Sequence, residues 1–198
     1  MTQESWKTAY RSFYYEHAPT PEELDLDPEK TALLVIDVQN AYMTESSDSA
    51  ERARWAPFMA RMHNQVIPNI QRLIEVSRSK SMNVMFARIA CQTPDGRDRS
   101  LSQRKPGFNN LLLPKDAWAS QIIGALAPMP EEIVVIKTTD SALTGTNLRL
   151  TLQNIGIQHV ICVGIFTDQC VSSTVRSLAD ESFDVIVCHD ACAAATDA

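Results

Sequence analysis

The chain has 198 residues, of which 44% are hydrophobic and 21% charged, and its formal net charge is −6. This composition predicts one globular domain with a full hydrophobic core, and it argues against two domains. The negative charge, without any cluster of Lys or Arg, gives no general attraction to nucleic acid or to an anionic membrane. A small-molecule ligand is therefore expected.

The ends of the chain and its cysteines predict a soluble protein of the reducing cytoplasm. Five Cys without a repeated short spacing do not form a disulfide framework, and the start lacks the pattern of a signal peptide. No apolar run approaches the ~20 residues of a membrane helix. Residues 1–30, polar and aromatic with several Pro, are expected to form an N-terminal arm. The arm either packs on its own domain or on a neighbouring subunit, or is a loosely ordered terminus.

From residue 31 onward, apolar runs alternate with helical patterns. Thr31–Ile36 is a continuous apolar run that predicts a buried strand, and it ends in Asp37. Residues 43–56 are polar and are interpreted as a loop. A helix is expected to begin at Pro68, with Ile70, Leu73, Ile74 and Ser77 on its inner face.

The middle of the chain continues this alternation. The expected elements are a strand at Asn83–Ile89, a long functional loop at 91–107, a short helix within 116–126, a buried strand at 133–136, and a helix at about 147–153. Gly156 is expected to stop the last of these. The third strand ends in Lys137, so a charged residue again follows an apolar run.

The stretch around Cys170 combines a strand with a helix start. Residues 160–163 form a short apolar run that Gly164 is expected to break, and helical spacing begins after Thr167 and Asp168, both acceptable N-caps. Cys170 should therefore lie in the first turn of a helix, where free backbone N–H groups favour a thiolate and can bind an oxyanion. A last strand is expected at 183–188.

This order of elements predicts an α/β fold, a three-layer α/β/α arrangement around a mainly parallel, doubly wound sheet. In such sheets the ligand site forms at the carboxyl ends of the strands. Asp37, Lys137 and Cys170 each follow a predicted strand. We therefore expect these three side chains to meet on one rim of the sheet.

Three motifs carry a resemblance to a known family, in the family's order. They are Val-Ile-Asp37-Val-Gln-Asn, Ile-Lys137-Thr-Thr-Asp-Ser-Ala-Leu and Gly-Ile-Phe-Thr-Asp-Gln-Cys170-Val. From about Thr31 to its end the chain resembles the isochorismatase-like cysteine hydrolases. That family includes nicotinamidases, N-carbamoylsarcosine amidohydrolases, ureidoacrylate hydrolases and biuret hydrolases. The predicted domains are thus an arm at 1–30 and a hydrolase domain at 31–198.

The resemblance implies a role for each motif residue. Cys170 would be the nucleophile, Asp37 the base and later the acid, and Lys137 the cation between them. A cis peptide is implied at Ile165–Phe166, and the backbone N–H groups of Phe166 and Cys170 would form the oxyanion hole. The resemblance further implies a thioester intermediate, no cofactor, and a homo-oligomer, either a dimer or a tetramer.

Two departures from the family pattern narrow the prediction. Nicotinamidases carry a metal site of Asp and His after the second strand, whereas the loop that follows Arg88 contains no His, so a metal-dependent nicotinamidase is disfavoured and no metal is expected. Family members also usually continue past the equivalent of Cys192 with another helix and strand. The sequence is therefore expected either to be incomplete or to build a shorter sheet.

The resulting hypothesis is an amidohydrolase that cleaves a C–N bond of a small carbamoyl or ureido compound. The alternatives are a vinyl-ether hydrolase of the isochorismatase kind, a nicotinamidase-like amidase, and a catalytically silent binding protein of the same fold. By their positions, the candidate substrate contacts are Gln39, Asn40, Tyr42, Arg88, Thr138, Phe166 and Thr167.

Overall fold

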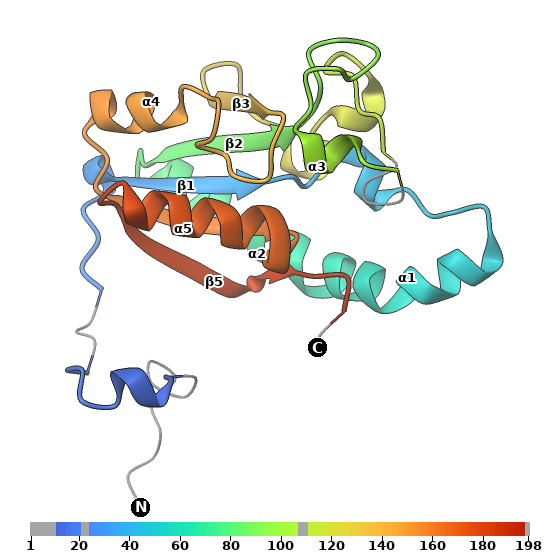
Figure 1. Cartoon of the computed structure of the whole chain (residues 1–198). Helices are drawn as coiled ribbons and strands as arrows, with labels where there is room; N and C mark the ends of the chain where they lie inside the picture. The colour runs from blue at the N-terminus through green and yellow to red at the C-terminus, as the bar shows by residue number, and fades with distance from the viewer. Residues whose placement is uncertain (1–10, 21–23, 107–110, 197–198) are drawn as a thin grey trace, which may run out of the picture.

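The computed structural model describes residues 11–20, 24–106 and 111–196, and its central feature is a parallel sheet between layers of helices (Figure 1). In the described residues the sheet has five strands in the order β3-β2-β1-β4-β5, and every pairing is parallel. The strands are β1 Thr31–Ile36, β2 Asn83–Ile89, β3 Ile133–Lys137, β4 His159–Ile165 and β5 Asp184–Ala193. The predicted three-layer α/β fold is confirmed.

Helices cover both faces of the sheet. On one face, Leu33 and Val35 of β1 belong to the core that includes Ile70 and Ile74 of α2. On the other, Leu34 and Ile36 share a core with residues of α4 and α5. The helix bounds are α2 Ile67–Ser79, α4 Leu148–Ile155 and α5 Ser172–Asp180. Because β1 is buried on both faces, its sequence is apolar without alternation.

The prediction of a loop at 43–56 is wrong for most of that stretch. Helix α1 spans Ser49–Arg61, and Asp48 caps it by accepting hydrogen bonds from the backbone N–H groups of Ala50 and Glu51. A π-helical turn at Met62–Val66 then joins α1 directly to α2, so the helical run begins well before Pro68. Only Phe58 of α1 is fully buried, which explains the polar pattern of its sequence.

Three other predicted elements also differ. The stretch 116–126 forms two short 3-10 turns, Trp118–Ser120 and Gly124–Leu126, in place of one helix. The loop at 91–107 contains a short helix, α3 Leu101–Arg104, and its last residue lies outside the described residues. Strand β5 is longer than predicted, and its pairing with β4 shifts register between Cys162 and Gly164.

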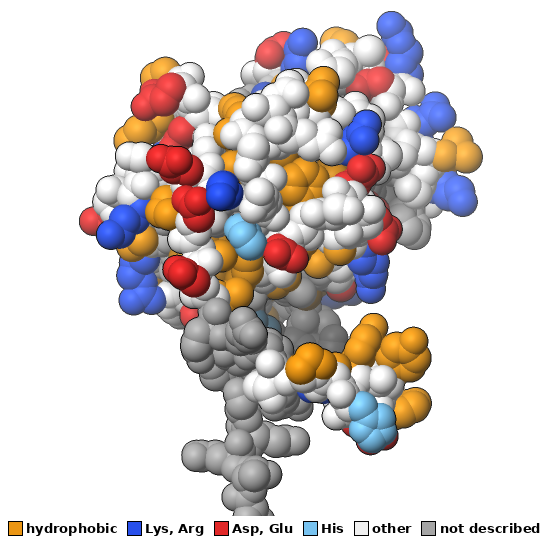
Figure 2. Space-filling view, turned by 90° about the vertical axis from the view of Figure 1, so that its left-hand side faces the viewer, with side chains coloured by type: hydrophobic (Ala, Val, Ile, Leu, Met, Phe, Trp, Pro, Cys, Tyr) orange, Lys and Arg blue, Asp and Glu red, His pale blue; other side chains and the backbone are white. Residues whose placement is uncertain are grey.

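The described parts of the predicted arm differ in their packing: Leu26 contacts the hydrophobic core, whereas residues 11–20 lie away from the sheet (Figure 1). A 3-10 turn at Phe13–Tyr15 lies apart from the domain in Figures 1 and 2, and Phe13 and Tyr14 are 87% and 79% exposed. Residues 1–10 and 21–23 of the arm lie outside the described residues. Packing on a neighbouring subunit stays a prediction. None of the described helices is long and apolar enough to cross a membrane.

Gly164 does not break its strand, because β4 continues through it to Ile165. Its φ is +120°, and a Cβ atom there would lie 2.1 Å from the backbone oxygen of Ile36. Glycine is therefore required for the close approach of β4 to the end of β1. Asp37 follows Ile36 directly, so this contact also positions the start of the site.

Gly164→Ala is expected to lower the free energy of unfolding by at least ~2 kcal/mol, since over-packing and a left-handed backbone both oppose the new side chain. Urea denaturation measures it. Gly145→Ala separates the two causes, because its φ is +73° but nothing lies within 4 Å of the new Cβ. Gly124→Ala, with open space and no positive φ, should change little. Equal losses in all three variants would contradict this account.

Candidate active site

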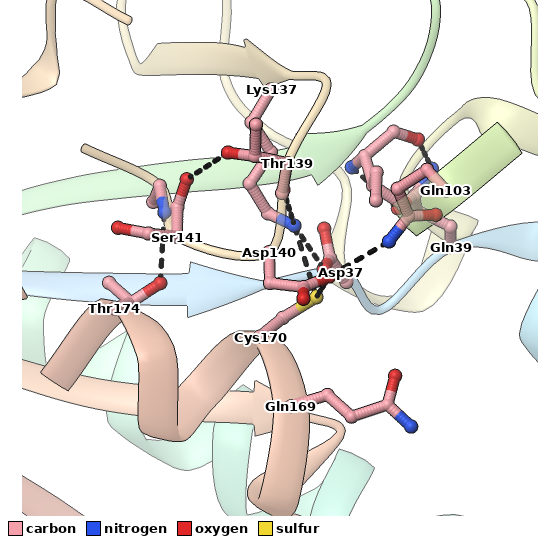
Figure 3. Close-up of polar contacts among 12 residues, drawn as sticks. Asp37, Gln39, Gln103, Lys137, Thr139, Asp140, Ser141, Gln169, Cys170 and Thr174 are labelled. Carbon is pink, nitrogen blue, oxygen red and sulfur yellow. Dashed lines mark hydrogen bonds and ion pairs between the residues drawn. The ribbon is translucent and has the colours of Figure 1, made fainter. Parts of the chain in front are cut away.

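The three predicted catalytic residues meet at the carboxyl ends of the strands (Figure 3). Lys137 is the last residue of β3, and Asp37 directly follows β1. Cys170 follows β4, inside a π-helical turn at Thr167–Val171 that continues into α5. Their exposed fractions are 0% for Lys137, 2% for Asp37 and 6% for Cys170, so a largely dry environment surrounds them.

Lys137 connects the other two side chains. Its Nζ lies 2.7 Å from Oδ2 of Asp37 and 3.2 Å from Sγ of Cys170, and it also donates to the backbone oxygen of Thr139 at 3.2 Å. The Asp37 carboxylate also interacts with the Cys170 side chain and with the backbone of Ile89. Asp37 therefore lies where it can accept a proton.

The backbone around the site has two unusual conformations. Asp37 has a φ of +55°, in the region that non-glycine residues rarely occupy, and its N–H donates to the backbone oxygen of Ala87 at 2.8 Å. The peptide Ile165–Phe166 is cis, as the resemblance implies. Phe166 precedes the turn of Cys170, and no side chain caps that turn, so the expected N-caps Thr167 and Asp168 do not act as caps.

Burial and charge set the protonation of the ion pair. Burial raises the pKa of Asp37 above its ordinary value, although the charge of Lys137 opposes this. Burial alone would lower the pKa of Lys137, but the negative charges of Asp37 and Cys170 outweigh it and raise that pKa. Lys137 therefore stays a cation, and Asp37 is a stronger base than an exposed carboxylate.

The thiol of Cys170 differs from the expectation that the helix start and Lys137 hold it as a thiolate. Burial raises the pKa of Cys170, and the charge of Asp37 raises it further, while Lys137 only partly offsets both. Desolvation of the charged form is thus the larger effect here. The resting side chain is a thiol beside a basic carboxylate.

Aromatic rings form one wall of the site. Tyr42 packs edge-on against Phe166 with ring centroids 5.4 Å apart, and Phe166 also contacts Phe58 and Trp55. Burial raises the pKa of Tyr42, and the nearby charges of Asp37, Cys170 and Asp140 add to the shift. The Tyr42 hydroxyl therefore stays protonated near the reacting groups. Trp55 and Phe58 were not predicted here, because Trp55 lies in the stretch 43–56 that was interpreted as a loop and no element was predicted around Phe58.

Two predicted substrate contacts have structural roles. The Gln39 side chain donates to the backbone oxygens of Ile89 and Ser120 at 2.9 and 2.7 Å, and it accepts from the N–H of Ile89. Arg88 donates to the backbone oxygens of Lys115 and Ser120 at 3.0 and 3.1 Å. Both side chains are buried and bonded within the protein, which argues against the predicted contact with substrate.

The other predicted contacts lie in different surroundings. Asn40 donates to the backbone oxygen of Trp118 at 2.8 Å, and Thr167 is exposed. Tyr42 and Thr138 line a small pocket together with Arg99 and Gln103. Sequence reasoning did not select Arg99 or Gln103, because the stretch 91–107 was predicted as a loop and shows no periodicity; Gln103 lies in the short helix α3.

Asp140 was also missed, although it lies three residues after Lys137. Its Oδ1 accepts a hydrogen bond from Nε2 of Gln103 at 2.8 Å and lies 4.0 Å from Sγ of Cys170 (Figure 3). The signal that could have found it is the position of Asp140 in the motif around Lys137. Among residues 11–20, 24–106 and 111–196, no group of three or more His, Cys, Asp or Glu side chains could hold a metal ion. A site without metal stays a prediction.

Comparisons with known proteins agree with the fold. A cysteine hydrolase from Pseudomonas syringae pv. phaseolicola is 23% identical with a TM-score of 0.72, over 87% of this chain and 76% of that one. An isochorismatase-like hydrolase from Alkaliphilus metalliredigens is 26% identical with a TM-score of 0.65, over 86% and 83%. An N-carbamoylsarcosine amidase from Thermoplasma acidophilum is 24% identical with a TM-score of 0.65, over 83% and 84%.

The sequence model of the isochorismatase domain matches residues 31–198, which is the whole region that the resemblance covers. The fold and the hydrolase neighbours agree with that match. This chain belongs to the isochorismatase family and has the fold of its cysteine hydrolases.

Proposed function

We propose that the protein is a cysteine-dependent amidohydrolase that cleaves a C–N bond of a small carbamoyl or ureido compound and releases ammonia. The observation that carries the proposal is the contact of Lys137 Nζ with both Asp37, at 2.7 Å, and Cys170, at 3.2 Å. This arrangement holds a nucleophile, a base and a cation within reach of one carbonyl group.

The proposed reaction begins with proton transfer. Asp37 accepts the thiol proton of Cys170, and Lys137 stabilises the thiolate as it forms. The sulfur attacks the carbonyl carbon, and the resulting oxyanion accepts hydrogen bonds from the backbone N–H groups of Phe166 and Cys170. Asp37 then returns its proton to the departing nitrogen, which leaves as ammonia or an amine. The carbon remains bound to sulfur as a thioester.

Water completes the cycle. Asp37, again a carboxylate, accepts a proton from a water molecule whose oxygen attacks the thioester, and Cys170 leaves as the thiolate and takes that proton back. A cysteine nucleophile argues against hydrolysis of a vinyl ether, for which no acyl group would be transferred to sulfur. The matched N-carbamoylsarcosine amidase supports a carbamoyl substrate by analogy of fold.

The small pocket near the triad is lined mostly by apolar residues, Ile89, Ala90, Cys91, Leu111 and Leu113, and its polar groups come from a few side chains. Thr138 and Gln103 bring hydrogen-bonding groups, and Arg99 brings a positive charge. A substrate with several C=O and N–H groups can pair with these polar side chains. An analogue that lacks one such group leaves a buried side chain without a partner and therefore binds more weakly. The Arg99 charge allows a substrate carboxylate, so we propose N-carbamoyl amino acids and ureidoacrylate together with the neutral compounds biuret and longer urea oligomers.

Loss of any member of the triad should abolish turnover. Cys170→Ser and Asp37→Asn are each expected to lower kcat by at least ~10³-fold, and Lys137→Ala nearly as much, because the three act as a unit. Steady-state rates of ammonia release measure this, with circular dichroism to check folding. Cys188→Ser, a half-buried cysteine of β5, is the matched control and should keep its activity. Near-normal turnover by Cys170→Ser would exclude the covalent mechanism.

The pH dependence of alkylation tests the charges around the thiol. Since Asp37 raises the pKa of Cys170, Asp37→Asn should move the inflection of iodoacetamide labelling to lower pH. Since Lys137 lowers that pKa, Lys137→Met should move the inflection to higher pH. Peptide mass spectrometry follows the labelling of Cys170 in each variant. At mildly alkaline pH, iodoacetamide should then label Cys170 faster in the Asp37→Asn variant than in the wild type, although this variant does not turn over substrate.

Shifts in the opposite directions would contradict the proposed electrostatics. Unchanged inflections would mean that neither charge acts on the sulfur.

A substrate panel tests the proposed class. We expect ammonia release from at least one of biuret, longer urea oligomers, ureidoacrylate or N-carbamoyl amino acids, because their C=O and N–H groups can pair with the polar side chains of the pocket. Nicotinamide, with a flat apolar ring, should release much less. Ammonia assays cover the amides, and product chromatography covers isochorismate as a second control. Preference for either control would overturn the assignment.

A further inference from the structure

Asp140 is an acidic side chain beside the reacting sulfur that the proposed mechanism does not use. Its Oδ1 lies 4.0 Å from Sγ of Cys170, while the base of the mechanism is Asp37, paired with Lys137 at 2.7 Å. Asp140 is half-buried, whereas the three triad residues are buried, and its side chain lies next to that of Cys170 in Figure 3. A second carboxylate at this point requires a different explanation.

The chain holds Asp140 in place from both sides. The next residues are fixed on α5, since the N–H of Ala142 donates to Oγ1 of Thr174 at 3.0 Å and the hydroxyls of Ser141 and Ser177 lie 2.9 Å apart. From the opposite side, Nε2 of the buried Gln103 donates to Oδ1 at 2.8 Å. A carboxylate held in this way is a fixed acceptor, not a mobile surface charge.

The chemistry of a carboxylate restricts what it can contact. An ionised carboxylate only accepts hydrogen bonds, so it pairs with N–H groups and repels carbonyl and carboxylate oxygens. A carbonyl carbon in position for attack lies ~3–3.5 Å from the sulfur. A group attached to that carbon on the Asp140 side of the sulfur comes close to the carboxylate, and the oxygen of the carbonyl must then point away from it.

We propose that Asp140, held by Gln103, accepts a hydrogen bond from an N–H of the nitrogen that stays attached to the attacked carbonyl. Asp140 thereby selects carbamoyl groups, which keep such a nitrogen, over acyl groups of the same size that carry a methyl group in its place. This inference rests on the proposed attack by Cys170 and specifies the substrate class of that same site.

A pair of esters tests the selection independently of the leaving group. Phenyl carbamate and phenyl acetate both release phenol, and they differ only in an amino group against a methyl group on the attacked carbon. The wild type should prefer the carbamate. Asp140→Asn should lower kcat/KM for phenyl carbamate by roughly 10-fold, because a neutral amide oxygen is a weaker acceptor than a carboxylate. It should leave kcat/KM for phenyl acetate nearly unchanged. Phenol absorbance follows both reactions.

Two further variants complete the test. Gln103→Ala, which frees Asp140 without removing its charge, should reduce the preference for the carbamate in the same direction and to a smaller extent. It also carries the test if Asp140→Asn does not fold. Asp180→Asn removes an exposed charge at the end of α5 and should leave the ratio of the two rates unchanged.

Equal losses on both esters would mean that Asp140 acts on the thiol or on folding, and would overturn the proposal. An unchanged ratio in Asp140→Asn and Gln103→Ala would also overturn it. Failure of the proposed function gives a different result, since none of biuret, longer urea oligomers, ureidoacrylate and N-carbamoyl amino acids would then be hydrolysed although both esters were cleaved at Cys170.

Discussion

The buried ion pair of Asp37 and Lys137 is the interaction on which the site depends. Asp37 directly follows β1 and Lys137 ends β3, and these strands lie on either side of β2. The two side chains meet at 2.7 Å, with 2% of Asp37 and 0% of Lys137 exposed. Removing either charge would leave the other buried and uncompensated, which typically costs ~3–5 kcal/mol. The same two side chains therefore affect both the free energy of unfolding and the proposed proton transfer at the carboxyl ends of the strands.

The position of Cys170 follows from the same arrangement. Strand β4 lies beside β1, so the turn that follows it brings the sulfur within 3.2 Å of Lys137. Burial raises the pKa of Cys170, so the sulfur is protonated at rest. Burial also raises the pKa of Asp37, which is the adjacent proton acceptor. A thiol and a basic carboxylate in a dry site exchange one proton without a change in net charge. In the proposed mechanism the thiolate forms only when Asp37 takes the proton, next to the bound carbonyl.

Much of this arrangement could be predicted from the sequence, because parallel strands buried on both faces are continuous apolar runs. Thr31–Ile36 was predicted with the bounds that the structure has, and the charged residues after such runs located the rim. Helix α1 was missed because only Phe58 of it is buried, and amphipathic periodicity is the signal on which a prediction relies. Gln39 and Arg88 were assigned to substrate because sequence position gives the rim but not the backbone oxygens that they bind. Asp140 was overlooked for the same reason, since its contact with Gln103 joins distant segments.

The central claim is that Cys170 forms a covalent bond with the carbonyl carbon of the substrate. Mass spectrometry of protein quenched in acid during turnover of phenyl carbamate tests it most directly, because phenol leaves readily and the acyl enzyme can accumulate. The account predicts one carbamoyl group on the peptide that contains Cys170, and none in Cys170→Ala. Phenol released in excess over enzyme, with the Cys170 peptide unmodified at every quench time, would contradict it.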